Sequence, residues 1–262
     1  MKTVAIALFS ETWKGFMISW SYKFNLLMSM LSLSFIFLGI NFMMGNGQLN
    51  ADTMASTLLG YLIWFYAITA IENMSYNLRD EMQCGQLEQL YMSPAPPQVL
   101  VLGRAFSTLI VSTIMVSVMV AVMITLFGIP MPMRLQGLPV FALTLGGLYG
   151  FGYILGGATL IFKQTGPLAN LLTNALLFTN GAILPVDRLP DWLQTLAKLL
   201  PSTQGILVLR KVILGGQSLS AAWSDGSLIL LVVHSVLFFA IGWLVYRLCE
   251  SVAKRKGSLG QY

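Results

Sequence analysis

The segment Asp80–Pro97, DEMQCGQLEQLYMSPAPP, lies between two long apolar runs and decides how the rest of the chain is arranged. Its apolar residues Leu87, Leu90 and Tyr91 are spaced i, i+3 and i+4, so they share one face of a helix. The prolines at its end stop that helix, because proline lacks an amide donor and restricts the residue before it. A helix this short needs support from another surface. We therefore predict that residues 80–93 form an amphipathic helix at the cytosolic membrane surface, where it contacts a partner protein.

The composition is that of a membrane protein. Of the 262 residues, 56% are hydrophobic and 10% are charged, whereas about 25% of residues are charged in a typical soluble domain. The net charge of +5 comes from Lys and Arg residues that are scattered or grouped at the end of the chain, so we expect no nucleic-acid partner. Because backbone amides in hydrocarbon must find partners within their own segment, we expect an all-α membrane protein embedded in the lipid bilayer.

The runs free of charged residues predict the membrane spans, since about 20 apolar residues are needed to cross the hydrocarbon core as a helix. They predict six transmembrane helices within one domain (residues 1–262), at about residues 24–44, 56–74, 105–127, 138–162, 167–184 and 227–248. In the fourth of these, Gly146 and Gly150, and likewise Gly152 and Gly156, have the small-x-x-x-small spacing that lets helices approach closely.

A helical pattern also precedes the first span. The large aromatic residues Phe9, Trp13, Phe16 and Trp20 form one stripe, with polar residues on the reverse side. This pattern predicts an N-terminal helix over residues 3–20 that lies in the headgroup region of the membrane. A frayed cytosolic tail is the alternative.

The segment 188–214, between the fifth and sixth spans, is too charged to cross the membrane but contains two short apolar pieces. Two half-length helices predict a re-entrant hairpin that dips into the outer leaflet. An ordinary amphipathic loop outside the membrane is the alternative. The residues that mark this outer motif are Pro185, Pro190, Trp192, Pro201 and Arg210.

Positive charges predict the orientation. If both termini are cytoplasmic, ten of the 15 Lys and Arg residues lie on the cytosolic side and five lie outside. Cytosolic loops carry the excess of positive charge in membrane proteins. We therefore predict a multi-pass protein with both termini in the cytoplasm.

Two motifs carry a family resemblance. The sequence GQLEQLYMSPAPP, preceded by Glu81 and followed by Leu102-Gly103-Arg104, resembles the cytosolic signature of type 2 ABC exporter permeases. The later Leu184-Pro185, Leu189-Pro190, Trp192, Leu200-Pro201 and Arg210 are similar to the second signature of that family. The resemblance implies the membrane-spanning subunit of a bacterial inner-membrane transporter, a homodimer that carries two ABC ATPase subunits on its cytosolic side. It also implies that the central helix is a coupling helix seated in a groove of the ATPase.

The coupling interface implied by this resemblance consists of Glu81, Gly85, Leu87, Glu88, Leu90, Tyr91 and Pro94. Where the family commonly has Gly-Thr-Leu-Glu, this chain has Gly85-Gln86-Leu87-Glu88, which keeps a polar side chain at the second position. The apolar residues would fill the groove, because the anchors of such contacts are usually aromatic or apolar. The alternative for the acids is that they are simply solvated, since an exposed ion pair contributes only about 0–1 kcal/mol.

Polar residues within the spans are candidates for a translocation pathway. Asn170 and Asn174 are spaced i, i+4 and therefore share one face of the fifth span, and Tyr61 and Phe65 on the second span are aromatic candidates. Packing between helices is the alternative for all four. Glu72 is interpreted as a marker of the cytosolic end of its span.

These observations predict a permease rather than an enzyme. The chain has no Gly-x-x-x-x-Gly-Lys-Ser/Thr stretch and only one histidine, so we expect no metal or cofactor in it, and ATP and Mg²⁺ on the partner ATPase. The predicted function is ATP-driven export of a hydrophobic or amphipathic substrate that is drug-like or lipid-like. The alternatives are export of a lipid-linked polysaccharide by the same machinery, a secondary carrier that is not coupled to ATP, and an intramembrane enzyme.

Overall fold

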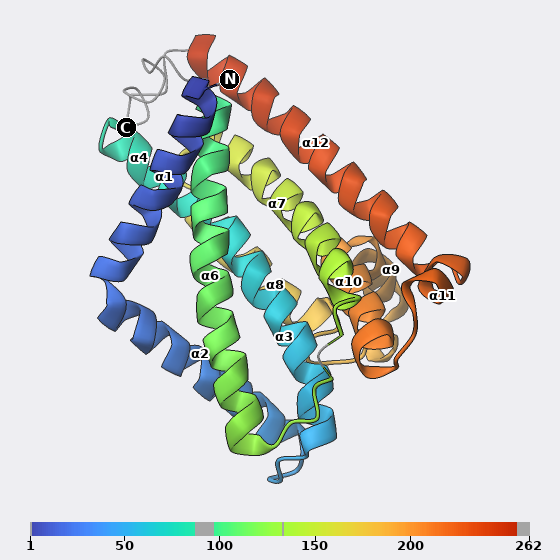
Figure 1. Cartoon of the computed structure of the whole chain (residues 1–262). Helices are drawn as coiled ribbons and strands as arrows, with labels where there is room; N and C mark the ends of the chain where they lie inside the picture. The colour runs from blue at the N-terminus through green and yellow to red at the C-terminus, as the bar shows by residue number, and fades with distance from the viewer. Residues whose placement is uncertain (1, 87–96, 133, 256–262) are drawn as a thin grey trace.

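The computed structural model describes residues 2–86, 97–132 and 134–255, and every regular element in these ranges is a helix (Figure 1). The start of α1 and the end of α12 lie at the same end of the helix bundle as α4 (Figure 1). We call this the inner end and the opposite one the outer end, in keeping with the predicted orientation. The described chain is therefore all-α, as predicted.

Five helical segments of the described residues are long and apolar enough to cross a membrane. One of them, the run Ala51–Gln83, joins three elements without a break: α3 (Ala51–Glu72), the π-helical segment η1 (Asn73–Asn77) and α4 (Leu78–Gln83). The other four are α2 (Lys23–Met44), α6 (Pro97–Phe127, with Ala105–Phe127 as its apolar part), α7 (Gly137–Phe162) and α12 (Ser227–Arg255). Several such helices make this a multi-pass membrane protein.

The shorter elements lie before and between these helices. They are α1 (Lys2–Ser21), α8 (Gly166–Thr179), the 3₁₀ turn η2 (Val186–Arg188), α9 (Asp191–Leu199), α10 (Pro201–Leu209), the π-helical η3 (Arg210–Leu214) and α11 (Leu219–Ser224).

Helix α7 is the centre of the bundle and packs against α3, α10 and α12. A methyl group added at Gly150 would lie 2.5 Å from the backbone of Phe239 in α12, and one added at Gly152 would lie 2.8 Å from the carbonyl of Ala70 in α3. Small residues are required at such crossings because the two backbones nearly touch. The predicted close approach is confirmed at these two glycines, whereas the space beside Gly146 is open.

Helix α1 carries the predicted aromatic stripe. Its rings follow one another at centroid distances of 6.5 Å for Phe9 and Trp13, 6.1 Å for Trp13 and Phe16, and 6.3 Å for Phe16 and Trp20. On the other side of α1, Thr12 donates to the carbonyl of Gly103 in α6 at 3.4 Å. Figure 1 shows α1 inclined along the inner part of α6 before the chain turns into α2. The headgroup location of α1 remains a prediction.

The fifth predicted span differs from the structure. Helix α8 has 14 residues, about 21 Å of helix against a hydrocarbon core of about 30 Å, and it ends at Thr179 rather than near residue 184. Asn180 and Gly181 end it: Gly181 has a positive φ of 81°, and the Asn180 side chain accepts a hydrogen bond from the amide of Ala182. A count of uncharged residues does not detect such a turn, although Asn-Gly is a turn signal.

The outer segment is ordered, and half of it belongs to the core. Pro201 opens α10, which contacts α3, α7 and α12, and residues 201–206 are all buried. A methyl group at Gly147 in α7 would lie 2.6 Å from the Pro201 ring. Helix α9 instead has Trp192 exposed on its surface. The depth of this pair of helices in the membrane remains a prediction.

Candidate functional site

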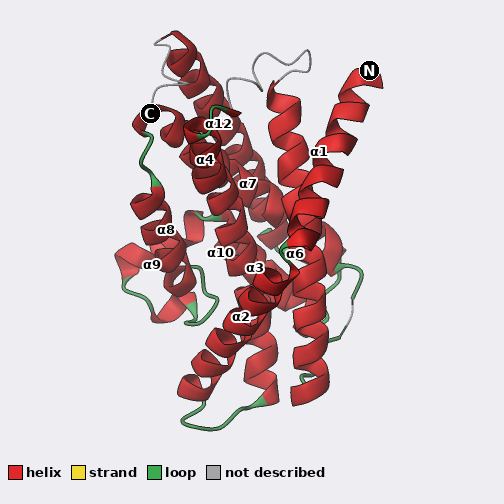
Figure 2. Ribbon diagram, turned by 90° about the vertical axis from the view of Figure 1, so that its left-hand side faces the viewer, coloured by secondary structure: helices red, strands yellow, loops and turns green. Residues whose placement is uncertain are grey.

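Helices α3 and α8 form an antiparallel pair. The indole Nε1 of Trp64 donates to the carbonyl of Thr173 at 2.8 Å, and the hydroxyl of Tyr76 donates to the carbonyl of Gly166 at 3.1 Å. Along the chain, Tyr76 follows Trp64 but its partner Gly166 precedes Thr173, so the two helices run in opposite directions. In Figure 2, α3 lies between α8 on one side and α1 on the other.

One stripe of α3 is left open in this arrangement. Most of the helix is buried, but Phe65 and Thr69 are half-buried and Glu72 is exposed. The spacing i, i+4 and i+7 places these three side chains on one face. Phe65 packs beside α2 and α6, where it lines a cavity of about 10 Å³ with Met30 and Met115, so the stripe is open only from Thr69 toward the inner end.

The two predicted asparagines of α8, Asn170 and Asn174, lie on the same side of the helix pair as the stripe on α3. Thr173 and Trp64 mark the contact between the helices, and Asn174 and Phe65 each follow the contact by one residue. One residue is a rotation of about 100°, and in two antiparallel helices this rotation leads to the same side of the pair. Asn170 lies one turn from Asn174, and both side chains are exposed. We call the surface made by Thr69, Glu72, Asn170 and Asn174 the α3–α8 face.

Glu72 lies inside the helical run rather than at its end. The run continues to Gln83, and Tyr76, one turn further on, bonds to the first residue of α8. Glu72 therefore lies level with α8, and its carboxylate has no hydrogen-bond or ion-pair partner among the residues described. The interpretation of Glu72 as a marker of the membrane boundary remains a prediction, since the helix continues past it to Gln83.

The two aromatic candidates are placed differently. Tyr61 is fully buried: its hydroxyl donates to the carbonyl of Leu33 in α2 at 2.9 Å, and its ring packs 5.5 Å from that of Phe37. Tyr61 thus holds α2 against α3 within one chain. Phe65, in contrast, is half-buried: it lines a small cavity with Met30 of α2 and Met115 of α6, and its ring lies 5.9 Å from that of Tyr66. The pathway role of both residues remains a prediction.

The π-helical segment η1 joins α3 to the turn between α7 and α8. Ser75 and Thr165 share a hydrogen bond of 2.9 Å between their hydroxyls, and Thr165 shares another of 2.6 Å with Thr159. The side-chain amide of Asn73 donates to Thr108 in α6. Segments of π-helix are rare and occur often at functional sites. Sequence reasoning missed η1, because its pitch depends on these partners rather than on local propensity.

A cavity of about 510 Å³ lies at the inner end, beside η1. Its polar lining includes Lys14 of α1, Asn73 and Asn77 of η1, Glu81 of α4 and Ser107 of α6. Of the predicted coupling residues, Glu81 borders this cavity, and Gly85 lies just beyond α4 with a positive φ of 68°. The remaining ones lie outside the described residues: Leu87, Glu88, Leu90, Tyr91 and Pro94.

Arg210, a residue of the predicted outer motif, connects three parts of the chain. Its Nε and Nη2 donate to the carbonyl of Ser56 at 3.2 and 3.1 Å, and Nη2 also donates to the carbonyl of Ala182 at 3.2 Å. The outer end of α3 is thereby bonded to the loop that follows α8. The other members occupy helix starts: Pro185 and Pro190 precede η2 and α9, Pro201 opens α10, and Trp192 lies in the first turn of α9.

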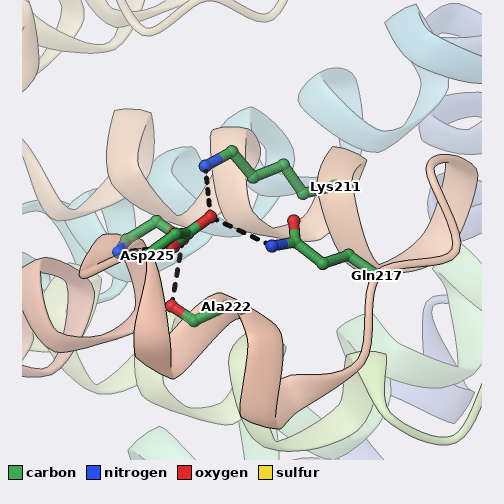
Figure 3. A network of polar contacts seen from close by, with 5 residues as sticks. Lys211, Gln217, Ala222 and Asp225 are labelled. Carbon is green, nitrogen blue, oxygen red and sulfur yellow. Dashed lines mark hydrogen bonds and ion pairs between the residues drawn. The ribbon is translucent and has the colours of Figure 1, made fainter.

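A second polar network fixes the start of α12 (Figure 3). The carboxylate of Asp225 accepts hydrogen bonds from the hydroxyl and amide of Ser227 at 2.6 and 2.9 Å. It also accepts hydrogen bonds from the side-chain amide of Gln217 and the ammonium group of Lys211, both at 3.0 Å. These donors stabilise the ionised carboxylate, the Ser227 hydroxyl most strongly, and hold the pKa of Asp225 well below its usual value.

Comparison with known proteins places the chain in a family. A family model described as ABC-2 type transporter matches residues 3–214. The chain is 26% identical over 153 residues to the probable multidrug ABC transporter permease YbhR of Escherichia coli (strain K12), a stretch that covers 58% of this chain and 41% of that protein. It is 33% identical over 104 residues to nodulation protein J of Rhizobium leguminosarum bv. trifolii, which covers 38% of each chain. The chain thus spans less than half the length of the curated relatives it matches.

Proposed function

The chain belongs to the ABC-2 type transporter family, and from this premise we propose that it is the membrane-spanning permease subunit of an ATP-driven exporter. The observation that carries the proposal is the family match over residues 3–214 in a chain with five apolar helices of spanning length. The proposed location is the inner membrane of a bacterial cell, with both termini in the cytoplasm.

The energy would come from partner chains. Two ABC ATPase subunits would bind ATP and Mg²⁺, because this sequence lacks the Gly-rich loop that holds nucleotide phosphates in such enzymes. They would dock against the coupling segment, residues 80–93. The chain path supports this arrangement: α3, η1 and α4 form one uninterrupted helical run that leads directly into that segment. A movement of the segment would therefore reach α3 without crossing a loop.

The substrate would pass between two copies of the chain, along the α3–α8 face. This face presents the polar ends of Glu72, Asn170 and Asn174 on otherwise apolar helices, which suits an amphipathic molecule better than a purely apolar one. The name of the E. coli relative, a probable multidrug permease, supports a drug-like substrate.

Export of a lipid-linked polysaccharide is less well supported. Such a pathway needs aromatic rings on an open surface, where they can stack on sugars. The rings of Tyr61, Trp64, Tyr66 and Tyr153 in α3 and α7 are buried in the packing of a single chain, although other rings, such as those of Phe106 and Phe178, are exposed.

The proposal is tested by isolating the chain from its native membrane together with its partners. We expect an ABC ATPase to co-purify with the tagged chain, and the reconstituted complex to move an amphipathic dye only when ATP is supplied. Leu87→Asp should abolish co-purification, whereas Leu199→Asp, on the exposed surface of α9, should not. Dye movement by the isolated chain without an ATPase would contradict the proposal.

A further inference from the structure

The cavity of about 510 Å³ at the inner end is enclosed by α1, the start of α2, η1, α4 and α6. Its volume lies within the range of about 300–1,000 Å³ that is usual for small-molecule sites. The side chain of Asn73 reaches α6 here, whereas Tyr76 bonds to α8. The described residues that line the cavity include none of the α3–α8 face, so the cavity is a separate site.

The cavity has a cation and a carboxylate in its lining, supplied by different helices. Asn73, Asn77 and Glu81 follow one another at intervals of four residues along one helical run, so they share one face. Helix α1 contributes Lys14, whose ammonium group has no hydrogen bond or ion pair to any described residue. A ligand in the cavity therefore meets a positive group, a negative group and two amides.

Helix α6 adds a buried hydroxyl that the protein itself does not use. Ser107 donates to the carbonyl of Thr12 in α1 at 3.2 Å. Ser112, five residues further along α6, also lines the cavity; it is only 6% exposed and has no hydrogen-bond partner among the described residues. Because buried hydroxyl groups are normally hydrogen-bonded, Ser112 indicates a bound group that accepts from it.

The rest of the lining is apolar and leads toward the middle of the bundle. Its members are Ile18 of α1, Leu26 of α2, and Val111 and Met115 of α6. Met115 also lines the small cavity beside Phe65, between α2, α3 and α6. The large cavity is thus polar toward the inner end and apolar beyond Ser112, as an amphipathic ligand requires.

The order of these groups along the bundle matches the order of groups in a phospholipid. Glu81 is eight residues closer to the inner end than Asn73, which bonds to α6. Lys14 follows Thr12, which is level with Ser107, and Ser112 lies about 8 Å of helix deeper than Ser107. From the cytosol inward, the cavity therefore presents a carboxylate, an ammonium group, a hydroxyl and an apolar end.

We propose that this cavity binds one inner-leaflet phospholipid whose head group carries a primary ammonium group, as in phosphatidylethanolamine. The lipid ammonium donates to Glu81 and to the asparagine amide oxygens, and the lipid phosphate accepts from Lys14. An ester carbonyl accepts from Ser112, and the acyl chains extend past Met115. This inference goes beyond the proposed function, because the lipid is a resident ligand of the chain and not the exported substrate.

The two charges set the preference among phospholipids. Phosphatidylglycerol has a phosphate but no cation, so it leaves Glu81 beside an anion. Phosphatidylcholine has a cation, but its quaternary nitrogen has no N–H to donate to the carboxylate. Phosphatidylethanolamine alone of the three satisfies both Lys14 and Glu81 by hydrogen bonds.

Three lipids with the same two oleoyl chains test the site: phosphatidylethanolamine, phosphatidylcholine and phosphatidylglycerol. Each is titrated into the delipidated full chain in a neutral detergent, and native mass spectrometry counts the lipids bound and gives their Kd. We expect one tightly bound phosphatidylethanolamine per chain, with a Kd about tenfold lower than that of the other two lipids. Equal Kd values for the three lipids would overturn the inference.

Variants show whether the bound lipid is in this cavity. Lys14→Met should weaken binding of phosphatidylethanolamine about tenfold, and Glu81→Gln should remove its advantage over phosphatidylglycerol. Lys198→Met, at an exposed position of α9, is the matched control and should leave the Kd unchanged. An unchanged Kd in Lys14→Met, or an equal loss in Lys198→Met, would overturn the inference.

Ser112→Ala keeps the test informative if a charge variant does not fold. It removes a hydroxyl without a partner in the protein, so the Tm of the lipid-free chain should not fall, while the affinity for phosphatidylethanolamine should fall several-fold. An unchanged affinity would contradict the placement of the lipid.

A soluble head group separates a lipid site from a site for a free phosphate ester. Glycerophosphoethanolamine, which lacks the acyl chains, should bind far more weakly than the whole lipid. Equal affinity for the two would show that the ligand is a soluble ester and would overturn the lipid assignment. The chain is tested without an ATPase, so the result does not depend on the proposed function.

Discussion

The two ends of the helical run Ala51–Gln83 are held in different ways. At the outer end, Arg210 bonds to the backbone of Ser56, and Gly60 is so close to the following loop that an added methyl group would lie 2.5 Å from the Cα of Ala182. At the inner end, the π-helical η1 is held by hydroxyl groups and borders a cavity of about 510 Å³. The outer end is therefore fixed by tight packing, whereas the inner end has exchangeable bonds and space. The proposed mechanism, in which the ATPase moves this helix from its inner end, would require such a difference.

Removing Arg210 should have the largest effect on stability. In Arg210→Met, three hydrogen bonds from a charged donor are lost, and we expect the free energy of unfolding to fall by about 1.5–3 kcal/mol. Thermal unfolding in detergent measures the change. Arg188→Met, at an exposed position of the same outer segment, is the control and should leave the Tm unchanged. Equal Tm values for the two variants would contradict an anchored outer end.

Adding a methyl group at Gly60 should weaken the same anchor by crowding. Gly60→Ala forces α3 away from Ala182, and overpacking of this kind costs about 1–3 kcal/mol. The identical substitution Gly146→Ala meets open space in α7 and should be neutral or slightly stabilising. Matching losses of stability in both variants would show that helix propensity, rather than the contact with Ala182, decides the effect.

A change at the inner end should affect coupling more than stability. Thr165→Val removes the hydroxyl that Ser75 and Thr159 share, at a cost of about 1 kcal/mol. We expect ATP-driven transport to fall several-fold while the Tm changes by a few degrees at most. Thr125→Val, at an exposed position of α6, controls for the substitution. A large loss of Tm with normal transport in the folded fraction would reverse the assignment of the two ends.

The smallest effect is expected at Asp225, which fixes the start of α12 from the protein surface. Because the pKa of Asp225 is depressed in the folded state, its stabilisation is present above the unfolded pKa of about 3.9 and is lost as the pH falls below that value toward the folded pKa. Asp225→Asn should therefore lower the Tm slightly at pH 7 and make no difference at the lowest pH reached. A Tm difference that grows on acidification would be inconsistent with this network.

Much of the fold could be predicted because it depends on composition and spacing. The charge-free runs located the five helices of spanning length, and the spacing of Gly152 predicted a close helix crossing. The spacing of the aromatic residues predicted the single stripe along α1. The end of α8 at Thr179 was missed, because a turn at Asn180 and Gly181 leaves the count of apolar residues unchanged.

The site was predicted in part. The shared face of Asn170 and Asn174 follows from their spacing alone, but the open side of α3 follows from how α2 and α8 flank it. For this reason Tyr61 lies in the core and Glu72 on the α3–α8 face, although neither position can be derived from periodicity. The π-helical pitch of η1 likewise depends on Thr165, which is distant in sequence.

The length of the run Ala51–Gln83 has a mechanical consequence. Its 33 residues make a rod of about 50 Å, well over the hydrocarbon thickness of about 30 Å. If Arg210 serves as the pivot near one tip, a tilt of about 5° sweeps the opposite tip through about 4 Å. Glu72, about 24 Å from the anchored Ser56, would move by about 2 Å in the same tilt, with the far side of the membrane almost at rest.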